Sequence, residues 1–121
     1  MAGVPVTNPQ DTIKLKITAA AGLSAGYFVL GSGAGVTNHE YANTPGILLK
    51  DTSVNEYGDV CIKGRCWGIA GDTLYVGSII VPSTTGTCIP VGATVSSSAH
   101  LPRGKALTAA TVGDYVEVDL Y

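Results

Sequence analysis

Charged residues are scarce in this chain: Asp, Glu, Lys and Arg make up 13% of its 121 residues, against ~25% in a typical soluble domain. A small domain has much surface and normally covers it with charge, so a charge-poor chain often buries part of that surface in an assembly. The alternative is a surface of Ser, Thr, Asn and Gly, which are plentiful here. Of the two, we expect burial against other subunits or a partner.

Positive charge is dispersed, and long apolar runs are missing. The net charge is −2, and the basic residues form no cluster: Lys14, Lys16, Lys50, Lys63, Arg65, Arg103 and Lys105. Nucleic-acid binding normally requires a clustered positive surface, so it is disfavoured. No apolar run approaches the ~18 residues of a membrane-spanning helix. The amino-terminal residues also lack the pattern of a signal peptide, so we expect synthesis in a reducing cytoplasm, no export by that route and no membrane partner.

The residue patterns of metal and cofactor sites are missing as well. A zinc site usually has four Cys or His ligands in close pairs, and His39 and His100 belong to no such pair. The glycine-rich run at residues 31–35 is not followed by the Lys of a phosphate-binding loop, and Val36 stands where a dinucleotide fingerprint has its last Gly. We therefore predict a hairpin turn at residues 31–35, no metal and no cofactor.

No arrangement typical of a catalytic site is recognisable either. The G-x-S-x-G nucleophile motif is missing, and solvated loop positions account for His39 and His100. Glu117 and Asp119 share one strand face, but we expect solvent around them so close to the carboxyl end. We predict that the protein is not an enzyme and has no catalytic residues.

The sequence does contain many short alternating segments. Ile13, Leu15 and Ile17 fall on one side of residues 12–17, and residues 115–120 alternate in the same way, which is the period of a strand with one buried face. Other short apolar segments, separated by Gly, Pro and polar turns, lie at residues 27–30, 46–50, 73–81, 87–91, 93–97 and 103–108. This pattern predicts an all-β fold, a small single-domain β-barrel or sandwich of short antiparallel strands over residues 12–121. At most one short helix is expected, near residues 19–24 or 97–102.

Residues 60–69 allow two interpretations. They can form one strand with Gly64 at a bulge or at a close backbone approach, or a hairpin that turns at Lys63 and Gly64. In the hairpin, Cys61 and Cys66 lie directly opposite each other, which makes a cross-strand disulfide conceivable. A cytoplasmic origin favours free thiols, and a small buried apolar side chain is the default for both and for Cys88.

The two ends of the chain are candidates for contacts with other molecules. Residues 1–11 have no periodicity and contain prolines that cannot donate backbone hydrogen bonds, so we predict an extended amino-terminal arm. The arm is either a disordered tail or a strap laid on a neighbour, with Val4, Pro5, Val6 and Pro9 as its contacts. Tyr121 either faces solvent or anchors a subunit contact, since Tyr is enriched at interfaces.

Three stretches of the chain resemble a known family. They are GKALTAATVGDYVEVDLY at residues 104–121, LSAGYFVLG at residues 23–31 with Gly35 and Val36 after it, and AGDTLYV at residues 70–76. In order and spacing they resemble the strands of the decoration or cement proteins that coat the heads of tailed bacteriophages. Together they span most of residues 12–121, although the Cys-Trp pair in residues 51–68 departs from the family pattern.

The resemblance implies a function. Members of this family bind the outside of the expanded icosahedral capsid, commonly as homotrimers, and brace it against internal pressure. It implies a structural virion protein, made in the host cytoplasm and placed on the outer capsid surface, with the major capsid protein as its partner. On this hypothesis Val4, Pro5, Val6 and Pro9 contact the capsid and Tyr121 lies at a subunit interface.

Two other functions are compatible with the same sequence. The first is another virion β-module, at the tail tip or associated with a fibre, which localisation on head or tail would distinguish. The second, less favoured, is a small hydrolase, which predicts a concave pocket with a perturbed His or Asp.

Overall fold

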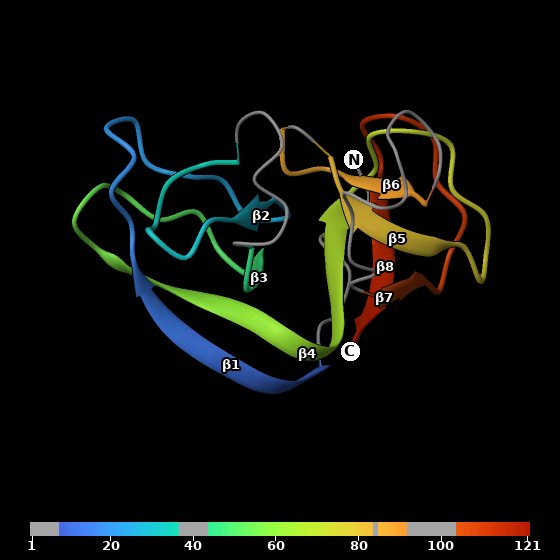
Figure 1. Ribbon diagram of the computed structural model, residues 1–121, viewed down its shortest axis with the longest axis horizontal. Helices are drawn as coiled ribbons and strands as arrows, with labels where there is room; N and C mark the ends of the chain where they lie inside the picture. The colour runs from blue at the N-terminus through green and yellow to red at the C-terminus, as the bar shows by residue number, and fades with distance from the viewer. Residues whose placement is uncertain (1–7, 37–43, 84, 92–103) are drawn as a thin grey trace.

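The predicted all-β, single-domain fold is confirmed. The structure, a computed structural model, describes residues 8–36, 44–83, 85–91 and 104–121, and its regular elements are eight strands (Figure 1). They are β1 (Asn8–Lys16), β2 (Phe28–Val29), β3 (Gly46–Leu48), β4 (Tyr57–Ile69), β5 (Ile79–Pro82), β6 (Cys88–Pro90), β7 (Gly104–Ala106) and β8 (Tyr115–Leu120). No helix occurs in these residues, so the helix considered near residues 19–24 does not form; residues 97–102 lie outside the described part.

One antiparallel sheet contains all eight strands, and β4 pairs with three of the others, β1, β3 and β8. The order is β2-β3-β4-β8-β7-β5-β6, with β1 paired to β4 outside this path. The first part of the 13-residue β4 pairs with β1 and β3, and its last part pairs with β8. Figure 1 shows β4 bending sharply near its middle, so that β2 and β3 lie on one side of its last part and β5 to β8 on the other.

Gly64 lies at this bend. Its φ of 99° is in the left-handed region that favours glycine, and the pairing of β1 with β4 shifts register immediately beside it. A Cβ on Gly64 would lie 2.4 Å from the backbone nitrogen of Gln10, because β1 passes directly against the bend. Residues 60–69 therefore form one bent strand with a close backbone approach at Gly64, as the single-strand interpretation predicted, and the hairpin alternative is wrong.

Both faces of β4 are buried around Val60 and Cys61. Val60 belongs to a small apolar cluster with Ile17, Val29 and Leu48. Cys61, on the opposite face, belongs to a larger cluster that also contains Cys66, Cys88, Ile47, Ile80 and the β8 residues Val116, Val118 and Leu120. One strand thus contributes to both apolar clusters.

Three turns of the described chain share one construction. They lie at residues 53–56, 75–78 and 111–114, and in each the backbone N–H of the last residue donates to the carbonyl of the first. The third residue has positive φ in every case: Asn55, Gly77 and Gly113. This is the conformation of a type II turn, and the second residue is always a valine: Val54, Val76 and Val112.

The boundaries of two predicted segments differ from the structure. A single strand was expected over residues 73–81, but the turn at residues 75–78 interrupts it and β5 begins only at Ile79. At the amino end the described part of β1 begins at Asn8, so residues 8–11, which the sequence placed in the arm, belong to a strand that pairs with β4. The strand expected at residues 93–97 lies outside the described residues.

Candidate interaction surface at the bend of strand β4

Two of the predicted contact residues lie near the bend of β4, on its two edges. Pro9 lies opposite Gly64 in the pairing of β1 with β4, and Leu120 lies opposite Gly64 in the pairing with β8. Tyr121, which follows Leu120, is 59% exposed. The first described residues of β1 and the last residues of β8 therefore flank the same part of β4. Val4, Pro5 and Val6 lie outside the described residues.

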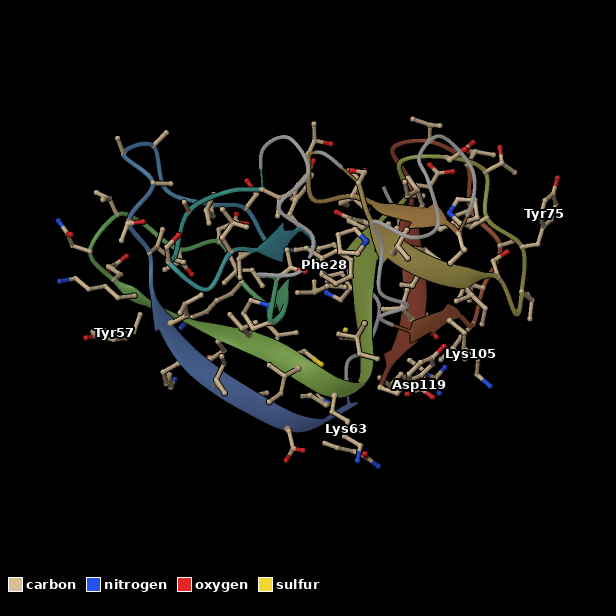
Figure 2. The ribbon with its side chains drawn as sticks, in the orientation of Figure 1. Phe28, Tyr57, Lys63, Tyr75, Lys105 and Asp119 are labelled. Atoms are coloured by element: carbon tan, nitrogen blue, oxygen red, sulfur yellow. The ribbon has the colours of Figure 1, made fainter. Side chains whose placement is uncertain are left out.

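Charged side chains of both signs surround this bend. Arg65 lies opposite Asp119, and its Nη2 is 2.6 Å from Oε2 of Glu117 on the same strand β8. Lys105 of β7 lies opposite Asp119 from the other side. Figure 2 shows Lys63, Asp119 and Lys105 on the side of the molecule where β4 bends. Because the signs alternate from strand to strand, this surface is suited to protein contacts rather than to a polyanion.

An aromatic pair covers the sheet just beyond the bend. The rings of Trp67 and Tyr115 meet edge to face, with 4.6 Å between their centroids and 83° between their planes. Trp67 is 5% exposed. Gly26 makes room for its ring, since a Cβ there would be 2.7 Å from Cζ3 of the indole.

A second group of exposed apolar side chains was not identified from the sequence. Tyr75, Val76 and Val112 are each about 70% exposed, and all three lie in the shared type II turns. The signal in the sequence is a valine before Gly or Asn at each turn, but the apolar composition of residues 73–81 predicts a strand there. Tyr75 lies at one end of the long axis and Tyr57, on β4, at the other (Figure 2).

The cavities of the described residues are shallow and contain no catalytic arrangement. One, of about 290 Å³, is lined mainly by apolar and aromatic side chains, among them Leu23, Tyr27, Phe28 and Val36. Another, of about 320 Å³, is lined by Lys50, Asp51, Thr52, Glu56 and Tyr57. No group of three potential metal ligands occurs in the described chain. His39 and His100 lie outside it, so their predicted solvated positions stay a prediction.

The three cysteines are free and buried, as predicted. The interaction with the Cys61 thiol and burial both raise the pKa of Cys66, while the same interaction lowers the pKa of Cys61. Burial alone raises the pKa of Cys88 to about 12. The two thiols with raised pKa are therefore protonated at neutral pH, which is typical of structural cysteines.

Comparison with known proteins reveals a fold relative. No family model and no curated protein matches the sequence. The structure is similar to that of the head fiber gp8.5 N base of bacteriophage phi29, with a TM-score of 0.60 and 16% sequence identity over 92% of this chain and 95% of that one. At this identity the similarity demonstrates a shared fold over nearly the whole length of both chains.

Proposed function

We propose that this protein is a structural component of a bacteriophage virion, attached to the outer surface of the head as a decoration or cement protein. The observation that carries the proposal is the shared fold with a phage head protein over more than nine-tenths of both chains. The sequence resemblance to decoration proteins, in three ordered stretches, points to the same part of the virion. The scarcity of charge fits a protein with surface buried in an assembly.

The proposed attachment surface is the bend of β4. Pro9 and Leu120, which precedes Tyr121, lie opposite Gly64 on the two edges of β4 there, and Val4, Pro5 and Val6 are the further arm contacts that we propose. The major capsid protein is the proposed partner. A homotrimer multiplies such small contacts, because binding through one subunit raises the effective concentration of the others.

The decisive experiment is co-sedimentation of the purified protein with heads that lack it. Saturable binding to expanded but not to unexpanded heads is the expected result, together with a threefold solution mass by light scattering. Tyr121→Ala should weaken binding, and Tyr57→Ala is its matched control. Tyr57 is 61% exposed, close to the 59% of Tyr121, but lies away from the bend. Equal loss in both variants would contradict attachment through the bend, and no binding to either form of head would contradict a cement role.

A second function, the base of a head fibre, is favoured by the identity of the structural neighbour itself. It predicts few copies at defined positions rather than a saturated lattice of sites. Copy number per virion and immunogold labelling distinguish the two: dense labelling over the head supports the decoration role, and sparse labelling at fibre attachment points supports the fibre base.

The proposed role is non-enzymatic, and the two histidines provide a direct test against a small hydrolase. Replacing His39 and His100 together by Ala should leave head binding unchanged. Loss of binding in a variant that folds normally would mean that one of them belongs to a functional site.

A further inference from the structure

The two parts of the sheet repeat one pairing pattern. In the first part, β4 pairs with β1 on one edge and with β3 on the other, and β3 pairs with β2. In the second part, β8 pairs with β4 on one edge and with β7 on the other, and β7 pairs with β5. The described residues within 12–63 and within 65–121, here called unit 1 and unit 2, therefore have the same strand order.

The registers of the two units agree as well. Each unit contains one row of four residues that lie opposite one another across adjacent strands. Row 1, in unit 1, crosses β2, β3, β4 and β1 and consists of Phe28, Ile47, Cys61 and Thr12. Row 2, in unit 2, crosses β5, β7, β8 and β4 and consists of Ile79, Lys105, Asp119 and Arg65. The two rows thus occupy the same place in the two units, strand for strand.

The similarity extends to the connections between the strands. Leu23 and Thr52 exchange two backbone hydrogen bonds in unit 1, as Leu74 and Ala110 do in unit 2. In both units the second residue of this pair is followed directly by a type II turn and then by the last strand of the unit. The units therefore share their loop geometry as well as their sheet.

The sequence carries a trace of the same repeat. The register aligns residues 46–63 with residues 104–121 without a gap. The identical positions are Gly46, Leu49, Val54, Tyr57 and Val60 in unit 1, which correspond to Gly104, Leu107, Val112, Tyr115 and Val118 in unit 2. The equivalence of the two rows therefore has support from residues as well as from pairing.

Unit 2 covers row 1. Phe28, Ile47 and Cys61 are each at most 1% exposed and belong to one apolar cluster with the core residues of unit 2. Phe28 N–H donates to the carbonyl of Gly86, at 2.8 Å. A Cβ on Gly68 would lie 3.4 Å from Cδ1 of Ile47. Row 1 is thus the surface on which unit 1 receives a unit of its own fold.

Row 2 is exposed and differs from row 1 in charge. Ile79 is 41% exposed, and Val91, whose N–H donates to the Ile79 carbonyl, is 40% exposed. The other three positions of row 2 are charged, with signs that alternate from Lys105 to Asp119 to Arg65. Stacked repeats in general end in a unit with a polar outer face, because further units would otherwise pack on it.

We propose that row 2 is a docking face for a second copy of this chain, which its charges keep closed. The repeat identifies the occupant, because the same place in row 1 is covered by a unit of this fold. A second copy would have to desolvate Lys105, Asp119 and Arg65, and this cost exceeds what burial of Ile79 and Val91 returns. The proposal does not depend on the proposed function, since it concerns contacts between copies of this chain alone.

Giving row 2 the composition of row 1 tests the proposal. Lys105→Ile, Asp119→Val and Arg65→Thr are combined, and mass is measured by light scattering. One copy should then dock on another, so the mass should rise to about twice that of the unchanged protein or more, and fall on dilution. Lys105→Val or Asp119→Val alone should leave the mass unchanged, because docking would bury the remaining charges without a partner.

A control variant distinguishes docking on row 2 from a general effect of lost charge. Lys50→Ile with Glu56→Val removes charges of both signs from unit 1 and should leave the mass unchanged. Glu56 precedes Tyr57, which lies at the end of the long axis away from Tyr75 (Figure 2). Adding Ile79→Arg to the triple variant returns a charge to row 2 and should restore the mass of the unchanged protein.

The outcome depends on a folded variant, which far-UV circular dichroism verifies. If the triple variant is unstable, Lys105→Met, Asp119→Asn and Arg65→Met remove the same charges with smaller changes of size and should also raise the mass. An unchanged mass in the folded triple variant, or an equal rise in the Lys50 and Glu56 control, would overturn the proposal.

Discussion

Gly64 combines two demands that other residues cannot meet. Its positive φ disfavours any side chain, and the Gln10 backbone occupies the space where a Cβ would lie. Gly77 has a similar φ of 90° but nothing within 4 Å of its Cβ position. The two glycines therefore separate the cost of the backbone conformation from the cost of the close approach.

Replacing each of these glycines by Ala gives the first prediction. Gly77→Ala should lower the free energy of unfolding by about 1–2 kcal/mol, the cost of a left-handed conformation. Gly64→Ala should cost a further ~1–3 kcal/mol, because β1 must move away from the bend. Urea denaturation measures both, and equal losses would contradict the close approach of β1.

Cys88 leads to a prediction about alkaline pH. Burial raises its pKa to about 12 in the folded protein, whereas an exposed cysteine titrates near ~8.5. Above the unfolded pKa the unfolded state loses its proton and is favoured, so stability should fall as pH rises from about 9 towards 12. Cys88→Ala should reduce this slope in urea titrations. An unchanged slope would assign the loss to other groups, such as the Cys66 thiol.

At the scale of the element, β1 is a long edge strand with protective features. Among the described residues it pairs with β4 alone, and Lys14 and Lys16 stand on its exposed face. The ammonium of Lys14 contacts Asp59 across the strand pair at 2.5 Å, which lowers the pKa of Asp59. Lysines and a proline on an edge strand discourage pairing with other molecules.

Removing these charges should expose the edge. Lys14→Val combined with Lys16→Val is expected to increase association of the folded protein, because the exposed face of the strand becomes apolar and rich in β-formers. Dynamic light scattering over time measures this association. Lys105→Val is the control, since β7 lies between β5 and β8. Similar association in the control would indicate a general effect of lost charge.

The elements also explain how much of the fold was predictable. Alternation identified β1 and β8 because the two faces of each strand differ in burial: half-buried and exposed in β1, buried and half-buried in β8. The bend of β4 was ambiguous because Gly64 is compatible with one continuous strand and with a hairpin turn. The pairing of β4 with β1 on one edge and with β8 on the other shows that the strand is continuous. The segment at residues 75–78 was misassigned because an exposed Tyr-Val pair has the composition of a strand, although Gly77 requires a turn.

The candidate contact residues were less predictable than the strands. Tyr121 and Pro9 were chosen independently from the two ends of the sequence, and nothing in their local patterns indicated that they lie beside the same glycine. That proximity follows from the pairing of β4 with both β1 and β8. Residue patterns within a segment predict a strand, but they do not show which distant strand it pairs with.

At the scale of the whole molecule, β4 makes the two parts of the sheet interdependent. Val60 of β4 belongs to the smaller apolar cluster, and Cys61 and Cys66 of the same strand belong to the larger one. If either apolar cluster unfolds, β4 is displaced, and the other cluster then loses the β4 side chains that pack in it. Unfolding should therefore be a single cooperative transition.

Core substitutions in each part test this cooperativity. Leu48→Ala in the smaller cluster and Leu120→Ala in the larger one should each cost about 2–5 kcal/mol. Both should shift one and the same transition, whether it is followed by Trp67 fluorescence or by far-UV circular dichroism. Separate midpoints for the two probes in either variant would show that the parts unfold independently.

The bend also determines how the molecule responds to mechanical force. The strands at the two ends of the described chain, β1 and β8, both meet β4 at Gly64 and Arg65. Tension applied between these ends pulls the two strands away from the bend, so ladder bonds break one after another rather than all together. A load applied across the far ends, near Tyr57 and Tyr75, instead stretches β4 along its length, where many bonds share it. The direction of pull, more than the total stability, should therefore decide when this domain fails.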